Sequence, residues 1–195
     1  MYRSLLTKIA LAVIFSALSV PTLAHTGAAV SYSFTDGFMH PWLGADHLLV
    51  IFAVGLVGRM VSGSSYWHLP LCFMIAMGAG ALYQFAGLTL ADAEWWVSLS
   101  VLFVGLVLGF KADMPLAWAF PLVGFFGLCH GYVHAAETGA HSDQIVYAAG
   151  FLFSTALLLC LSMATRWLCA SHFKQLRIGY GLASILSGFE LLTGF

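Results

Sequence analysis

Residues 40–57 read HPWLGADHLLVIFAVGLV, in which ionisable side chains precede ten residues that have none. The whole chain shares the apolar character of those ten, because 61% of its 195 residues are hydrophobic and only 8% are charged. Soluble domains carry about 25% charged residues, so most of this surface must face lipid. An Asp, Lys or Arg inside a span costs about 2.5–3.5 kcal/mol, and such residues usually serve a function. The stretch therefore predicts a membrane helix with a polar site at one end.

Five further apolar runs follow the first, each of roughly 16 to 21 residues. At ~1.5 Å per residue, a helix of that length matches a hydrocarbon layer of ~30 Å. The runs are continuous rather than alternating, which favours helices over the strands of a membrane barrel. The predicted fold is all-α, a polytopic six-helix bundle over residues 25–195 with spans near 42–57, 69–88, 95–110, 115–133, 145–165 and 178–194. The net charge of −1 argues against a nucleic-acid partner.

The first 24 residues are typical of a secretory signal peptide. A basic start precedes an apolar run from Ile9 to Val20, which at about 12 residues is too short to span a bilayer. Small residues follow at the positions expected for a cleavage site, which would make His25 the first residue of the mature chain. An uncleaved signal anchor is the alternative interpretation.

The distribution of basic residues gives an independent prediction of orientation. A cleaved signal peptide places residue 25 outside, and six spans then place the loops near 59–68, 111–114 and 166–177 inside. All five Lys and Arg residues after the signal peptide lie in these three loops, as the positive-inside rule requires. We therefore expect a multi-pass protein of the bacterial inner membrane with both termini in the periplasm. Homo-oligomers remain open, as does an inverted repeat of three plus three spans.

A second group of ionisable residues ends the fourth predicted span. His130 and His134 are one helical turn apart, and Glu137 lies three residues further on, so all three share one helical face. Two imidazoles one turn apart with a carboxylate nearby are typical of helices that bind metals. Hydrogen-bonded packing is the alternative role for a histidine inside a membrane.

Chain direction brings the two groups to the same depth. The first span is predicted to run inward and the fourth outward, so both groups fall in the outer third of the membrane. Pro41 suits the first turn of the first helix, and His40 and His47 would then lie two turns apart on one face, beside Asp46. Four imidazoles and two carboxylates favour Ni, Co, Zn or Cu(II) over Mg or Ca. His25 is an accessory candidate, because a terminal amine and its own imidazole can chelate one ion.

These residues also resemble a known family. The pattern His40-Pro41-x-x-Gly44-x-Asp46-His47 and the pattern His130-Gly131-x-x-His134-x-x-Glu137 are similar to those of the HupE/UreJ family of nickel permeases. The resemblance extends over the signal peptide and the six spans, so it covers nearly the whole chain. It implies nickel or cobalt as the transported substrate, since family members are associated with hydrogenases and ureases. By resemblance the metal-handling residues are His40, Asp46, His47, His130, His134 and Glu137. The chain departs from the family at Val50-Ile51, where a Met is expected.

The predicted function is transport of a divalent metal, most simply Ni²⁺, without catalysis. His40 and His25 would begin to replace water on the ion, which would then reach His47, Asp46, His130 and His134, with Glu137 at the mouth. No GxxxxGK[ST] motif occurs, so ATP is not expected to drive the step. Three other classes remain open: a haem-binding redox subunit, a membrane metallohydrolase with Glu137 as base, and a metal-binding accessory protein or sensor.

Overall fold

The structure is a computed structural model that describes residues 33–61, 66–112, 114–138 and 143–194. The predicted signal peptide and His25 lie outside the described residues. The described part of the chain is helical throughout, with elements α2 (Phe34–Leu43), α3 (Ala45–Val61), α4 (His68–Phe85), α5 (Ala93–Phe110), α6 (Leu116–Glu137), α7 (Gln144–Leu168), the short 3-10 helix η2 (Ala170–His172) and α8 (Phe173–Thr193). The predicted all-α class is confirmed for these residues.

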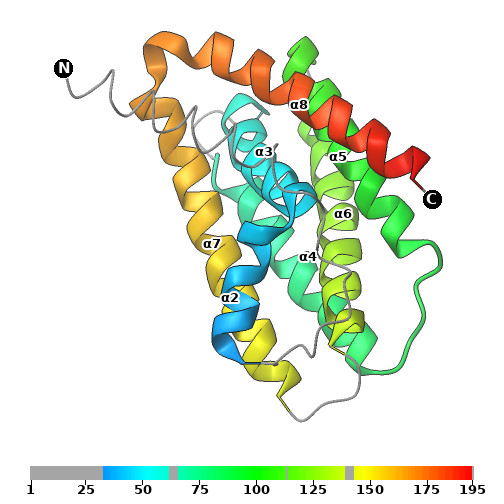
Figure 1. Cartoon of the computed structure of the whole chain (residues 1–195). Helices are drawn as coiled ribbons and strands as arrows, with labels where there is room; N and C mark the ends of the chain where they lie inside the picture. The colour runs from blue at the N-terminus through cyan, green and yellow to red at the C-terminus, as the bar shows by residue number, and fades with distance from the viewer. Residues whose placement is uncertain (1–32, 62–65, 113, 139–142, 195) are drawn as a thin grey trace.

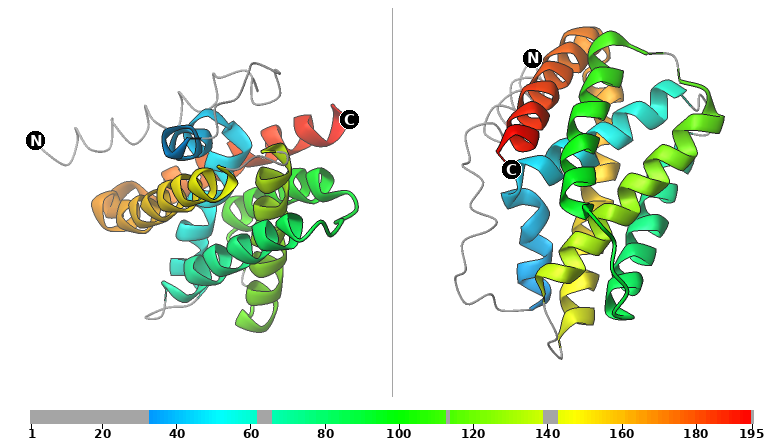
Figure 2. Two further views of the ribbon diagram at one scale, coloured as in Figure 1. Left: turned by 90° about the horizontal axis from the view of Figure 1, so that it is seen from below. Right: turned by 90° about the vertical axis from the view of Figure 1, so that its right-hand side faces the viewer.

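The helices form a bundle built from neighbouring pairs (Figures 1 and 2). Helix α4 packs along α6, α5 packs along α8, and the successive helices α2 and α3 both pack on α7. Helix α8 crosses one end of the bundle obliquely, at a marked angle to α7 (Figure 1). The start of α2 and the end of α6 lie at the opposite end, beside the start of α7. We call this the α2 end of the bundle.

Four of the described helices are long and apolar enough to cross a membrane on their own, namely α4, α5, α6 and α7. Helices α2 and α3 pass the same test only when taken together as one broken span, which gives a fifth. Helix α8 is not among these candidates, so the six-span count and the inverted repeat stay predictions. Large apolar side chains cover the outside of the bundle, such as Ile75 and Leu82 on α4 and Phe153 on α7. A surface of this kind is suited to lipid rather than to water.

The first span is broken, contrary to the continuous helix that the sequence predicts. Helix α2 ends at Leu43, α3 begins at Ala45, and the two are bent by 82°. Pro41 lies in the last turn of a helix that began at Phe34, rather than in the first turn of a new one. Proline removes a backbone donor and disfavours continuation of the helix, and Gly44 then adopts an extended conformation. The idea that His40 and His47 share one face of a straight helix is therefore wrong.

Side chains from α7 and α8 hold the two halves of the broken span in place. The indole N–H of Trp42 at the end of α2 donates to Ser154 Oγ on α7 at 2.7 Å. The hydroxyl of Tyr180 on α8 is shared between the carbonyls of Leu48 and Leu49 in α3, each at 3.0 Å. Ser162 on α7 also donates to a carbonyl of α3. These hydrogen bonds connect both halves of the broken span to α7 and α8, so the bend is part of the packed structure.

Glycines allow the helix pairs to approach backbone to backbone. A Cβ atom at Gly131 of α6 would lie 1.8 Å from the carbonyl oxygen of Met77 on α4, and one at Gly80 of α4 would lie 2.0 Å from the carbonyl oxygen of Leu128. Gly37 of α2 meets α7 in the same way. Small residues at these positions provide the close van der Waals packing that holds membrane helices together.

This packing predicts the effect of Gly131→Ala. The added methyl overlaps a backbone oxygen, which has no low-energy way to move aside, so α6 must separate from α4. Overpacking of this kind costs about 1–3 kcal/mol. We expect the purified protein to unfold at a clearly lower temperature, measured by thermal denaturation in detergent. Gly78→Ala on α4 is the matched control, because a Cβ there meets no atom within 4 Å. Equal unfolding temperatures for the two variants would contradict this account of the α4–α6 contact.

Candidate metal site

Ionisable residues from both sequence motifs meet near the α2 end of the bundle. His40 lies in the last turn of α2, and Asp46 and His47 lie in the first turn of α3. His134 and Glu137 end α6. In a straight helix His40 and His47 would be about 10 Å apart along the axis. Across the bend their ring centroids are 5.2 Å apart, so the break itself brings the two imidazoles together.

Three imidazoles form the centre of the site. One ring nitrogen each from His40, His47 and His134 lies within 4.8 Å of the others. The ring of His134 lies 4.1 Å from that of His47 and 4.8 Å from that of His40, centroid to centroid. A metal bound at about 2.1 Å from each ligand places those ligands about 3.0–4.2 Å apart. The three nitrogens therefore need only a small movement inward to bind one ion.

Glu137 adds a carboxylate to the same group. Its Oε2 atom is 3.4 Å from Nε2 of His40 and 3.4 Å from Nδ1 of His134. This separation matches the edge of a tetrahedral site with bonds of about 2.1 Å. The side chain of Glu137 is 26% exposed and that of His40 is 17% exposed, against 4% for His134. Glu137 and His40 thus form the outward-facing part of the cluster.

Asp46 lies beside one of the three imidazoles. Its Oδ2 atom is 3.5 Å from Nδ1 of His47, in the first turn of the same helix. A carboxylate beside the second nitrogen of a metal-binding imidazole orients the ring and raises its basicity. Asp46 thus faces the imidazole of the residue that follows it in the chain. The negative charge also suits the start of a helix.

His130 stands apart from the three-histidine group. Its ring centroid is 6.1 Å from that of His47 and 6.4 Å from that of His134. The close group thus contains His40 together with His47 and His134, and a role for His130 at the ion stays a prediction. The bend explains this grouping, because it turns α2 and its histidine onto the end of α6. His25, the remaining candidate, lies outside the described residues.

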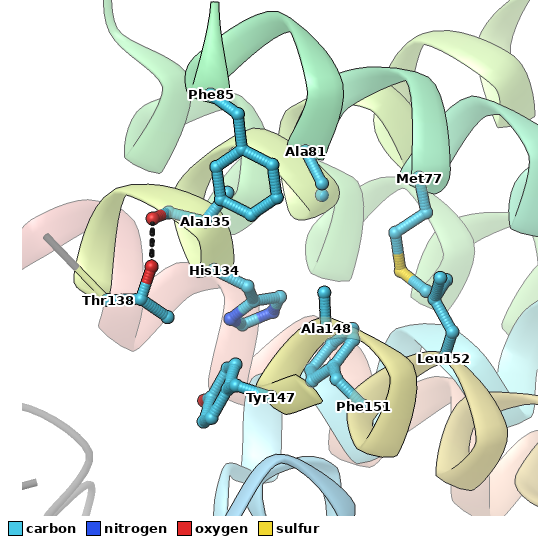
Figure 3. A pocket seen from close by; sticks show the side chains of 11 residues that line it. Met77, Ala81, Phe85, His134, Ala135, Thr138, Tyr147, Ala148, Phe151 and Leu152 are labelled. Atoms are coloured by element: carbon cyan, nitrogen blue, oxygen red, sulfur yellow. Dashed lines mark hydrogen bonds between the residues drawn. The ribbon is translucent and has the colours of Figure 1, made fainter. Parts of the chain in front are cut away.

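Aromatic side chains of α7 close one side of the cluster. Phe151 packs on His134 at 4.3 Å between ring centroids, and Tyr147 lies 6.0 Å from His40. Figure 3 shows His134 pointing toward Tyr147 and Phe151, across from Met77 of α4. The cavity there has about 20 Å³, enough for one water molecule, and its lining is almost wholly apolar. No sequence motif marks these α7 residues, which are apolar like their neighbours.

Cys129 takes no part in the site. It is fully buried and packs with Ala93, Val97 and Val133, on another face of α6 from His134. The donors that converge are thus imidazole nitrogens and carboxylate oxygens. Such a set suits borderline divalent ions such as Ni²⁺, Co²⁺ and Zn²⁺.

Comparison with known proteins identifies the family of this chain. The family model described as HupE / UreJ protein matches residues 12–191. The chain is 33% identical over 182 residues to Protein HupE of Rhizobium leguminosarum bv. viciae. The aligned residues make up 92% of this chain and 95% of the relative. No solved structure matches the chain significantly. On the extent of these two matches, the chain belongs to the HupE/UreJ family.

Proposed function

We propose that this protein carries a divalent transition metal, Ni²⁺ first and Co²⁺ second, across the bacterial inner membrane into the cell. The observation that carries the proposal is the meeting of His40, His47 and His134 with Glu137 at one end of a bundle of membrane helices. The choice of nickel or cobalt rests on the family, whose members are associated with nickel enzymes. The metal is the transported substrate rather than a resident cofactor.

The direction of transport follows from the predicted topology. If the signal peptide is cleaved and six spans follow, the α2 end of the bundle faces the periplasm. The basic loops then lie in the cytoplasm, in agreement with the positive-inside rule. A hydrated ion would meet the partly exposed Glu137 and His40 before the buried His47 and His134.

Stepwise exchange of ligands is the chemistry that the cluster supports. Moving a bare divalent cation into lipid is prohibitive, so each water that leaves must be replaced by a protein donor. Glu137 supplies charge at the mouth, and the imidazoles supply neutral nitrogen ligands further in. The gradient of the ion, the membrane potential or protons would then drive the step without ATP.

The packing of the rings favours an ion over a haem. Two histidines that ligate one haem must leave room for a planar macrocycle between them. Here the ring centroids of His40, His47 and His134 lie 4.1–5.2 Å apart, with His40 stacked on His47 and His134 edge-to-face with both. A single cation fits among these nitrogens with little movement, whereas a macrocycle would have to separate α2 from α6.

Replacing a central ligand tests the proposal. In His47→Ala, one of three converging nitrogens is lost from a buried position, and we expect nickel uptake to fall by about tenfold or more. The measurement is accumulation of radioactive nickel in cells that express equal amounts of each protein in the membrane. His172→Ala is the matched control, because His172 is exposed and lies in η2, between α7 and α8. Nickel uptake that is unchanged in His47→Ala would contradict the proposed transport through this site.

The break in the first span predicts a second, subtler effect. A Cβ atom at residue 44 would lie 2.4 Å from Cδ2 of the His47 ring, so Gly44→Ala pushes that ring aside, and the three atoms nearest to the added methyl all belong to side chains. We expect a folded protein with weaker nickel binding, measured by titration of the purified protein. Gly179→Ala on α8, where a Cβ meets no atom within 4 Å, is the control and should bind nickel as the wild type does. Unaltered affinity in Gly44→Ala would show that the position of the His47 ring does not matter.

A further inference from the structure

His130 combines two features that the three-histidine cluster does not explain. Only 1% of its surface is exposed, and it lies one helical turn before His134, about 6 Å further from the α2 end. Its Nδ1–H donates to the carbonyl of Phe126 at 2.8 Å. That bond leaves Nε2 as the nitrogen with a lone pair, and among the described side chains no hydrogen-bond partner meets this atom. A buried acceptor without a partner is rare in folded proteins.

The arrangement of His130 is that of a metal ligand. Imidazoles that bind metals almost always donate their other N–H to a carbonyl or a carboxylate, which fixes the tautomer and the direction of the ring. The Phe126 carbonyl does this for His130. The Nε2 atom is thus prepared to accept a cation, although the ring lies outside the close group of His40, His47 and His134.

Burial orders the donors into a sequence from outside to inside. The exposed fraction falls from 26% for the Glu137 side chain and 17% for that of His40 to 4% for those of His47 and His134. His130 ends the series. The two middle imidazoles are also the two whose rings lie within 6.1–6.4 Å of His130.

An apolar region follows His130 on the side away from the α2 end. Phe126, whose carbonyl binds His130, lines a cavity of about 10 Å³ together with Val50, Val54 and Met114. No polar side chain lines this cavity. On this route, among the described residues, His130 is therefore the last nitrogen donor before an apolar barrier.

We propose that His130 marks a second metal position, and that the ion passes there from the first. The first position uses His40, His47, His134 and Glu137. The second keeps His47 and His134 and exchanges His40 and Glu137 for Nε2 of His130. Two imidazoles hold the ion throughout, so it is never bare inside the membrane. The rings of His47 and His134 lie 6.1 and 6.4 Å from that of His130, centroid to centroid.

This inference rests on the proposed function, and one set of variants tests it separately. His40→Ala, His130→Ala and His130→Asn are compared with wild type for Co²⁺ binding to the purified protein, followed by its visible spectrum, and for nickel uptake. We expect His40→Ala to lose about tenfold or more in Co²⁺ affinity. His130→Ala should keep the affinity and spectrum of the first position but lose uptake by a similar factor.

His130→Asn separates transfer of the ion from structural support. Asparagine places an N–H close to the position of Nδ1 and can restore the bond to the Phe126 carbonyl, but it has no equivalent of Nε2. We therefore expect His130→Asn to be as inactive in uptake as His130→Ala. Recovery of uptake in His130→Asn, normal uptake in His130→Ala, or equal loss of Co²⁺ affinity in His130→Ala and His40→Ala would each overturn the second position. A wild-type protein that neither bound nor moved metal would instead remove the proposed function itself.

Discussion

The 82° bend between α2 and α3 is the constraint on which the candidate site depends. A straight helix would carry His40 about 10 Å away from His47 along its axis, beyond the reach of one ion. The bend brings the two rings within 5.2 Å and turns both toward the end of α6. Pro41 and Gly44 interrupt the helix, while hydrogen bonds from Trp42 and Tyr180 hold its two halves against α7 and α8.

Close helix packing gives the bend a rigid frame. Gly131 allows α6 to lie against α4 beside His130 and His134, so the second motif is fixed where the broken span arrives. Non-helical backbone at membrane depth is tolerated where protein buries it or where it lines a cavity. The interruption at Gly44 meets this condition, since the residue is buried next to the His47 ring. Gly44 thus both interrupts the helix and lies against a ring of the candidate site.

The position of the helices could largely be predicted from the sequence, because lipid requires long apolar runs with satisfied backbone groups. The convergence of the two motifs could also be predicted, since both lie near the same end of the bundle. The bend could not, because Pro41 is compatible with the first turn of a helix as well as with its last. One signal was available: Ser33 and Asp36 form a capping box that starts α2 before Pro41.

The close contact of His40 with His47 and His134 depends on that bend. The broken span puts His40 beside His47 and His134 and leaves His130 one turn deeper. The position of Tyr147 and Phe151 beside the histidines could not be predicted from the sequence. Apolar residues on a membrane helix form the same pattern whether they face lipid or a site. Side-chain direction in such a helix is decided by its neighbours, which only the structure supplies.

The central claim is that imidazoles from α2, α3 and α6 bind one cation together. X-ray absorption spectroscopy of nickel bound to the purified full-length protein tests it most directly, because imidazole rings, oxygen and sulfur ligands give distinct scattering. The account predicts three imidazole nitrogens and at least one oxygen in the first shell, with no sulfur. A spectrum with sulfur ligands, or with one imidazole or none, would contradict it.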